Sequence, residues 1–161
     1  MAKLIIALMY KNKKVLDRTI SKLKKIFGEI DLSISYDFNF TEYYKDDFGD
    51  KLKKKIVSFK KQTNKGLAEI KILTNNIEKE FSANKKRIIN IDPGYVTMHN
   101  LVLASVKESP HRVNIGRGIY AESILFFKNK QFNEYYYTFQ DYRQEKVKLF
   151  FKEVRDSIRN H

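Results

Sequence analysis

The chain has 161 residues with 42% hydrophobic and 14% aromatic content, which is typical of a folded globular domain and unlike a disordered chain. A chain of this length can bury a core of its own, so we expect a single domain over residues 1–161. The absence of cysteine excludes disulfides and thiolate zinc sites.

The formal net charge of +13 has two interpretations. A strongly basic chain can bind nucleic acid, which makes RNA a candidate partner. Lysines are spread over every segment, however, and we favour the second interpretation, a solvated lysine surface. The apolar run over residues 4–9 is too short to span a membrane and has no signal-peptide cleavage pattern. We therefore expect a cytoplasmic protein without a membrane partner.

The first half of the sequence predicts strands and helices in a recognisable order. Its elements are a strand over residues 3–10, a helix over 14–27, a strand over 30–40, a strand over 51–60, a helix over 65–82 and a short strand over 87–91. The first strand is a continuous apolar run, as expected for burial on both faces. The last strand meets Asp92-Pro93-Gly94, which predicts a turn. This order is that of the ferredoxin-like split βαβ arrangement.

The second half predicts an antiparallel meander and a final helix. Its strands are expected over residues 100–107, 111–115, 119–127 and 131–137, and the helix over 142–159. Turn residues separate the strands, including a Gly-Arg-Gly turn before the third. We therefore predict an α+β fold in which a ferredoxin-like half is extended by a β-meander and a C-terminal helix.

Strand geometry brings three polar side chains of the meander together. If a three-residue loop joins its first two strands, Lys107 lies opposite His111 on one face. The Gly-Arg-Gly turn can close in two registers, and both place Glu122 on the His111 face. A slip of one residue would move Glu122 to the face of Arg112 instead.

These residue types suit a phosphate site. An ammonium binds phosphate, an imidazole transfers protons and a carboxylate orients the imidazole, so the catalytic candidates are His111, Glu122 and Lys107. The ligand-binding candidates are Arg112, Arg143, Asp141, Asp92, Tyr95 and Tyr120. The two arginines can hold a phosphate through two hydrogen bonds each. The alternative for the cluster is an ordinary salt bridge at a sheet edge.

Several common motifs are absent from the sequence. It contains no Gly-x-x-x-x-Gly-Lys-Ser/Thr phosphate loop and no dinucleotide-binding Gly-x-Gly-x-x-Gly. Its three histidines form no His-x-x-x-His pair, so we predict no zinc site. A divalent ion on the oxygens of Glu42, Asp92, Glu122 and Asp141 is left as an alternative, but their spacing does not support it, and we name no metal ligand. The motifs identify no cofactor.

The chain resembles the prokaryotic domain-of-unknown-function family 4416 nearly end to end. The resemblance is carried by Phe40-Thr41-x-Tyr43-Tyr44, Thr74-Asn75-x-x-Glu78, Asn90-Ile91-Asp92-Pro93-Gly94-Tyr95, Leu103-Ala104-Ser105-x-Lys107, His111-Arg112, Gly118-Ile119-Tyr120-Ala121-Glu122 and Asp141-Tyr142-Arg143. Where the family pattern resembles Thr-Tyr-Pro-Asp-Tyr-Arg, this chain has Thr138-Phe139-Gln140-Asp141-Tyr142-Arg143, and the lost proline is expected to loosen the approach to the last helix. The resemblance implies a shared polar site. Some members are labelled GTP-binding, which the missing phosphate loop does not support.

Three functions therefore compete. The first is the binding or processing of a small phosphate-bearing, nucleotide-like ligand. The second is RNA binding by the basic surface. The third is a structural or partner-binding role without chemistry. We favour the first because the site-type residues converge on the meander, whereas the charge is diffuse. The sequence predicts no oligomeric state.

Overall fold

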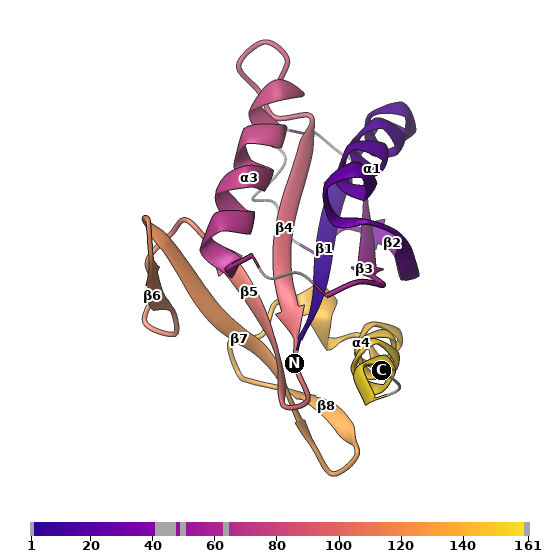
Figure 1. Cartoon of the computed structure of the whole chain (residues 1–161), viewed down its shortest axis with the longest axis vertical. Coiled ribbons are helices and arrows are strands. Elements are labelled where there is room, and N and C mark those ends of the chain that lie inside the picture. The colour runs from indigo at the N-terminus through magenta and orange to yellow at the C-terminus, as the bar shows by residue number, and fades with distance from the viewer. Residues whose placement is uncertain (1, 41–47, 49–50, 63–64, 160–161) are drawn as a thin grey trace.

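A computed structural model describes residues 2–40, 48, 51–62 and 65–159, and these form an α+β structure (Figure 1). The strands are β1 (Lys3–Tyr10), β2 (Ile30–Phe38), β3 (Leu52–Phe59), β4 (Ile89–Val96), β5 (Asn100–Ser105), β6 (Val113–Gly116), β7 (Ile119–Lys128) and β8 (Gln131–Glu134). The helices are α1 (Lys13–Phe27), α3 (Leu67–Glu80), the 3-10 helix η1 (Gln140–Arg143) and α4 (Glu145–Arg159). The strands build an eight-stranded antiparallel sheet in the order β2-β3-β1-β4-β5-β7-β6, and β8 also pairs with β7.

Strand β1 lies between β3 and β4 and is buried on both faces, as its apolar sequence predicts. Leu4, Ile6 and Leu8 belong to one core, together with apolar residues of α1 and α3. The intervening Ile5 and Met9 belong to a second core, which includes the apolar stripe of α4. Helices α1 and α3 therefore cover one face of the sheet, and α4 covers the other (Figure 1). Each fully buried aliphatic side chain contributes about 1.5–3 kcal/mol to this packing.

Strand β4 is longer than predicted, because Asp92-Pro93-Gly94 continues the strand and forms no turn. Pro93 lies opposite Ile6 of β1, and β5 pairs with β4 only from Gly94 onward. Gly94 has a packing role: a Cβ placed on it would lie 2.5 Å from the backbone oxygen of Val102. The glycine thus permits the close approach of β5, and Asp92 remains on a strand with its side chain beside a cavity.

The predicted hairpin between the strands at 100–107 and 111–115 does not form. Strand β5 pairs along its whole length with β7, so β7 separates β5 from β6. Strand β6 is a short, exposed edge strand that pairs only with the first part of β7. The Gly-Arg-Gly turn between β6 and β7 is confirmed, and all three of its residues have positive φ.

The predicted strand over 131–137 ends at Glu134, and a turn over residues 135–138 follows. The Thr138 hydroxyl accepts a hydrogen bond from the Tyr135 N–H at 2.8 Å and donates one to the Ile124 carbonyl at 2.6 Å. Thr138 therefore fixes the approach to the last helix through hydrogen bonds, although the family proline is missing. The helix itself begins at Glu145 and not at residue 142, because Tyr142 belongs to η1.

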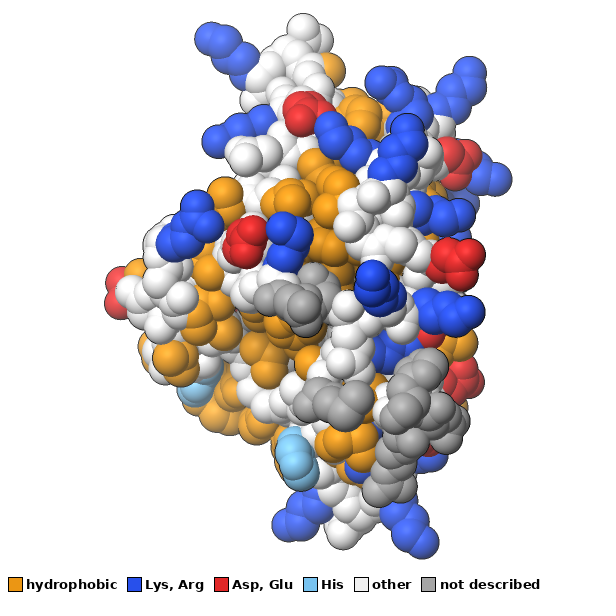
Figure 2. Space-filling model, viewed as in Figure 1, with side chains coloured by type: hydrophobic (Ala, Val, Ile, Leu, Met, Phe, Trp, Pro, Cys, Tyr) orange, Lys and Arg blue, Asp and Glu red, His pale blue; other side chains and the backbone are white. Residues whose placement is uncertain are grey.

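Figure 2 shows lysine and arginine side chains spread over the part of one face where α1 and α3 lie. They alternate there with acidic, polar and hydrophobic side chains and do not gather into one block. Among the described residues, no helix combines the length and the apolar character that crossing a membrane requires.

Candidate functional site

A cavity of about 650 Å³ lies where β3, α3, β4 and β5 approach η1 and the segment before β6. Its volume is in the range of small-molecule sites in proteins. Among the described residues, its charged lining consists of Lys54, Lys71, Arg87, Lys107, Arg112, Glu78, Asp92, Glu122 and Asp141. Five basic and four acidic side chains therefore face one cavity, whereas the rest of its lining is mostly aromatic or apolar.

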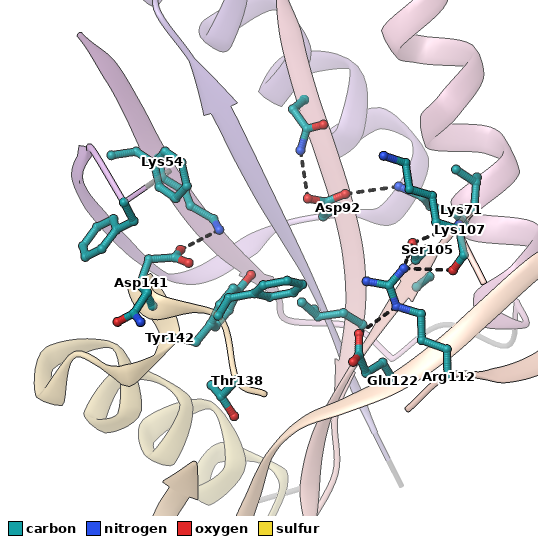
Figure 3. A pocket seen from close by; sticks show the side chains of 18 of the residues that line it. Lys54, Lys71, Asp92, Ser105, Lys107, Arg112, Glu122, Thr138, Asp141 and Tyr142 are labelled. Carbon is teal, nitrogen blue, oxygen red and sulfur yellow. Dashed lines mark hydrogen bonds and ion pairs between the residues drawn. The ribbon is translucent and has the colours of Figure 1, made fainter. Parts of the chain in front are cut away.

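A buried ion pair joins β3 to η1 at one end of the cavity (Figure 3). The Lys54 ammonium donates to Asp141 Oδ2 at 2.6 Å, and the Tyr36 hydroxyl donates to the same oxygen at 2.7 Å. Lys54 also lies over the ring of Tyr142, with its nitrogen 4.5 Å from the ring centre. Burial first, and then the nearby Tyr142 and Asp141, raise the pKa of Tyr36, so its hydroxyl stays protonated and remains a donor.

A second ion pair joins α3 to β4. The buried Lys71 ammonium lies 3.2 Å from Asp92 Oδ1, and Asn90 Nδ2 donates to Asp92 Oδ2 at 2.8 Å. Arg87 in turn donates to Asn90 Oδ1 at 2.7 Å. Burial alone would raise the pKa of Asp92, but the Lys71 and Lys54 ammonium groups and these hydrogen bonds lower it below its usual value. Asp92 is therefore a stable carboxylate at neutral pH.

Glu78 of α3 lies close to the Lys71–Asp92 pair, and its pKa is shifted in the opposite direction from that of Asp92. Its Oε1 accepts a hydrogen bond from the Ile91 N–H at 2.7 Å, and only 8% of the residue is exposed. Burial raises the pKa of Glu78, and the Asp92 carboxylate adds to the effect, whereas Ile91 and Lys71 oppose it. The folded protein therefore holds a proton on Glu78 to a higher pH than the unfolded chain does.

This raised pKa predicts a pH-dependent stability difference between the natural protein and Glu78→Gln. The amide keeps an acceptor for Ile91 but cannot ionise. The pKa of Glu78 in the folded protein lies above its ordinary value of 4.5. The contribution of protonated Glu78 to the stability of the fold is therefore fully present below pH 4.5 and is lost as the pH rises through the raised pKa. We expect the natural protein to lose stability relative to E78Q as the pH rises from 4 to 8 in urea titrations. A constant difference, or one of opposite slope, would contradict the burial of an ionisable Glu78.

Arg112 organises the opposite wall of the cavity, next to β5 and β7 (Figure 3). Its Nε donates to Glu122 Oε2 at 2.9 Å, and its Nη1 donates to Ser105 Oγ at 3.0 Å and to the Lys107 carbonyl at 2.8 Å. Its Nη2 makes no hydrogen bond to any residue that the structure describes. The guanidinium is thus held in a fixed orientation with one nitrogen left to bind an anion.

Tyr142 lines the cavity between these ion pairs, and 1% of the residue is exposed. Within the described part of the chain, its hydroxyl is the one buried side-chain polar atom without a hydrogen-bond partner. Phe38, Phe40, Tyr137 and Phe139 supply aromatic surface to the same cavity. Phe139 is 45% exposed, so part of this aromatic surface is open to solvent.

The predicted cluster of Lys107, His111 and Glu122 does not form as expected, because Arg112 takes the place of His111 beside Glu122. The turn between β6 and β7 closes with Gly116 opposite Ile119, which is one of the two expected registers. A bulge between Asn114 and Gly116 then shifts the pairing by one residue, so Val113 lies opposite Ala121. This shift brings Arg112 opposite Glu122. It is the slip of one residue that the sequence analysis gave as the alternative, in which Glu122 lies on the face of Arg112.

His111 lies instead in an aromatic stack outside the cavity lining. Its ring is parallel to that of Tyr137, with the ring centres 4.1 Å apart, and Tyr137 stacks in turn on Tyr135. The Tyr136 hydroxyl lies 2.7 Å from His111 Nε2. Both faces of Tyr137 are covered by these contacts, so His111 and Tyr137 secure the turn after β8 against the segment before β6.

The remaining candidates divide between the cavity and the scaffold. Asp92 and Asp141 line the cavity, as do Lys107, Arg112 and Glu122. Arg143 lies outside its described lining and binds the turn before η1, because it donates to the carbonyls of Thr138 at 2.8 Å and Tyr136 at 2.7 Å. Tyr95 faces the α1 and α3 core and donates to the Lys65 carbonyl at 2.5 Å. Tyr120 lies on β7 opposite Ser105 and is likewise not part of the described lining.

Sequence reasoning did not name several residues of the cavity as site candidates, namely Lys54, Lys71, Glu78, Arg87, Asn90 and Tyr142, although Glu78, Asn90 and Tyr142 stand in the motifs that carry the family resemblance. The two lysines carried a usable signal of another kind. Lys54 occupies the same face of β3 as the buried Leu52 and Ile56, so it interrupts an apolar alternation. Lys71 shares a buried helical stripe with Thr74 and Glu78, at spacings of three and four residues. Both lysines are buried cations, and their pattern is difficult to recognise in a sequence that has lysines in every segment.

Among the described residues, no group of three or more histidine, cysteine, aspartate or glutamate side chains could hold a metal ion. The ionic lining of the cavity instead consists of paired lysine, arginine and carboxylate groups, which suit an organic anion. Neither the curated proteins nor the solved structures contain a match to the chain. A family model does match residues 1–158, and the chain therefore belongs to the family described as Domain of unknown function (DUF4416).

Proposed function

We propose that the cavity binds a small phosphate-bearing, nucleotide-like ligand. The observation that carries this proposal is the Arg112 guanidinium, which three acceptors hold at the cavity wall while its Nη2 has no bond to a described residue. A guanidinium fixed in this way is preorganised to bind a phosphoryl oxygen. Lys107 lines the same wall and adds a second positive charge.

The aromatic part of the lining supports the nucleotide-like character of the ligand. Phe40 and Phe139 line the cavity beside its charged groups, and Phe139 is partly exposed. Nucleobases stack well on such side chains, at about 1–3 kcal/mol per base. Basic side chains on the face in Figure 2 are spread out, which favours a small ligand over an RNA backbone.

We also infer that the first half of the chain is a ferredoxin-like unit that serves as the scaffold of this site. The strand order β2-β3-β1-β4 supports this inference, since β1 pairs antiparallel with both β3 and β4. Two β-α-β connections then interlock, and α1 and α3 lie on the same face. Lys54, Lys71 and Asp92 belong to this unit, whereas Arg112 belongs to the second half.

A thermal-shift screen tests the proposed function. Ribonucleoside phosphates and sugar phosphates should stabilise the protein, by about 2.7 kcal/mol for a ligand at a hundred times its dissociation constant. For a chain of this size, that corresponds to a rise of about 5–11 °C in Tm. Arg112→Gln should abolish most of the shift. Arg117→Gln removes the same charge from the exposed Gly-Arg-Gly turn and should leave the shift intact.

Two results would contradict the proposal. One is the absence of a shift with every phosphate compound. The other is an equal shift in the natural protein and in R112Q, provided that the unliganded variant is folded with a cooperative transition. An equal loss in R112Q and R117Q would instead indicate diffuse attraction by the net charge, which is the behaviour expected of a basic surface without a site.

A further inference from the structure

Helix α3 presents a polar stripe to the cavity. Lys71, Asn75 and Glu78 follow one another at spacings of four and three residues, and all three line the cavity. Lys71 is paired with Asp92. Asn75, by contrast, makes no side-chain hydrogen bond to any residue that the structure describes. Its carboxamide is therefore available to a ligand in the cavity.

Glu78 uses only one of its two carboxyl oxygens in the fold. Its Oε1 accepts the Ile91 N–H at 2.7 Å, whereas Oε2 has no hydrogen-bond partner among the described residues. In that part of the chain the Tyr142 hydroxyl is the one partnerless side-chain polar atom that is fully enclosed, so Glu78 Oε2 retains accessible surface. Because the rest of Glu78 is buried and the residue lines the cavity, this oxygen is open to the cavity.

The chemical state of Glu78 determines what this oxygen offers. Burial is the largest influence and raises the pKa of Glu78, and the Asp92 carboxylate adds to the effect. The Ile91 N–H, the Lys71 ammonium and the Arg87 guanidinium act in the opposite direction without cancelling the rise. Since Oε1 accepts the Ile91 N–H, the proton of the neutral carboxyl is carried by Oε2. Protonated Glu78 is thus a hydrogen-bond donor to the cavity.

An uncharged polar group suits this stripe better than a phosphate does. An ionised Glu78 repels an anion, and Asn75 has no charge to attract one. The protonated carboxyl supplies a donor, and the carboxamide supplies both a donor and an acceptor. One edge of adenine has the complementary pattern, because an unprotonated ring nitrogen lies next to an amino group.

The stripe lies on the same side of the cavity as the proposed phosphate site. Helix α3 contacts β5 and β7, and these strands carry Ser105 and Glu122, which hold Arg112. Figure 3 likewise shows Lys71 of α3 and Arg112 on one side of the cavity, away from Lys54. One small ligand can therefore contact the stripe and the guanidinium together.

From this arrangement we infer that Asn75 and Glu78 bind the base of a nucleotide whose phosphate lies against Arg112, and that the base is adenine. Glu78 Oε2 donates to a ring nitrogen of the base, and the Asn75 carbonyl oxygen accepts from its amino group. The inference rests on the proposed function and specifies the base and its orientation. Arg112 supplies affinity for the phosphate, and the two residues of α3 determine specificity for the base.

Three probes that share a ribose 5-phosphate group test the base site. Adenosine 5′-monophosphate (AMP) carries adenine, and ribose 5-phosphate carries no base. Inosine 5′-monophosphate has the same ring system as AMP, with an N–H and a carbonyl in place of the ring nitrogen and the amino group. By isothermal titration calorimetry at pH 6, the natural protein should bind AMP about tenfold more tightly than either other probe, or by about 1.4 kcal/mol.

Asn75→Ala should remove the preference for AMP and leave the affinity for ribose 5-phosphate unchanged, because only the acceptor for the amino group is lost. Asn76→Ala is the matched control, since Asn76 is the next residue of α3, is exposed and is not part of the described lining. It should bind all three probes like the natural protein. An equal loss of every probe in N75A, or the same loss of AMP in N76A, overturns the inference.

Glu78→Gln distinguishes a donor to the ligand from a purely structural carboxyl. The amide keeps an N–H donor at every pH, whereas Glu78 loses its proton as the pH rises. The preference of the natural protein for AMP over ribose 5-phosphate should therefore fall from pH 5 to pH 9, and that of E78Q should stay constant. Both probes carry a phosphate monoester that titrates near about pH 6, so its titration cancels in the ratio. A constant preference in both proteins, or a parallel fall, overturns the role of Glu78.

The natural protein alone separates this inference from the proposed function. Binding of ribose 5-phosphate without a gain for AMP overturns the inference and leaves the proposed function in place, as does tighter binding of the inosine nucleotide. If N75A fails to fold, this ranking of probes and the pH dependence of E78Q decide. Binding of none of the three probes, in a screen where no phosphate compound binds, overturns the proposed function and the inference together.

Discussion

Asp141→Ala is expected to destabilise the fold by about 3–5 kcal/mol, because it leaves the Lys54 ammonium buried without its counter-charge. The side chain of Lys54 is 9% exposed and that of Asp141 is 4% exposed, so water cannot readily replace the carboxylate. The Tyr36 hydroxyl loses its acceptor in the same variant. Urea unfolding at pH 7 measures the loss as a lower midpoint with an unchanged slope.

An exposed pair provides the matched control. Lys22 of α1 and Glu80 of α3 form this pair, and their side chains are 37% and 56% exposed, so Glu80→Ala should cost no more than about 1 kcal/mol. The double variant Lys54→Met with Asp141→Asn removes the buried charge and keeps an acceptor for Tyr36. It should recover a large part of the stability that D141A loses. Similar losses in D141A and E80A would mean that the Lys54–Asp141 pair is hydrated.

The sequence predicted individual elements well where burial follows a simple period. The apolar run over residues 3–10 coincides with β1, and the stripe of α1 ends at Gly28, whose φ of 94° stops the helix. These features are local, because one strand or helix determines its own pattern of buried positions. The α+β class and the C-terminal helix follow from the same reasoning.

Pairing between strands was predicted less well, because it depends on contacts that no local pattern specifies. One bulged residue between Asn114 and Gly116 exchanged His111 for Arg112 beside Glu122. The insertion of β7 between β5 and β6 removed the expected pairing of Lys107 with His111. Five of the nine candidate residues nevertheless line the cavity. The segment before β6 still contacts Glu122, but it does so through Arg112 and not through His111.

The other half of the cavity could not be predicted, since it is assembled across the whole chain. Lys54 and Asp141 are 87 residues apart and meet only when β3 packs beside η1. Tyr142 was predicted only as the start of the last helix, and an aromatic ring there would be an ordinary core residue. Only its position at the cavity, with a hydroxyl that lacks a partner among the described residues, distinguishes it from such a residue.

Gly94→Ala is expected to cost about 1–3 kcal/mol or more, although it adds a single methyl group. An added Cβ would lie 2.5 Å from the Val102 carbonyl oxygen and 2.6 Å from Leu103 Cδ2. A side chain can rotate away, but the Val102 oxygen belongs to the backbone of β5, so the two strands must separate. Urea unfolding measures the loss, with Gly66→Ala as the control, because nothing lies within 4 Å of a Cβ at Gly66. That control should stay within about 1 kcal/mol of the natural protein, the remaining loss being that of an alanine at the N-cap of α3.

The same methyl group should also weaken ligand binding, because β4 and β5 carry opposite parts of the cavity. Asp92 and its partner Lys71 lie on the β4 side, whereas Ser105, which orients Arg112, is the last residue of β5. Separating the strands would move these groups apart without altering any of them. The Tm shift produced by ribose 5-phosphate should therefore be smaller in G94A than in G66A. An unchanged shift, together with the expected loss of stability, would show that the ligand does not bridge the two strands and contacts only one wall.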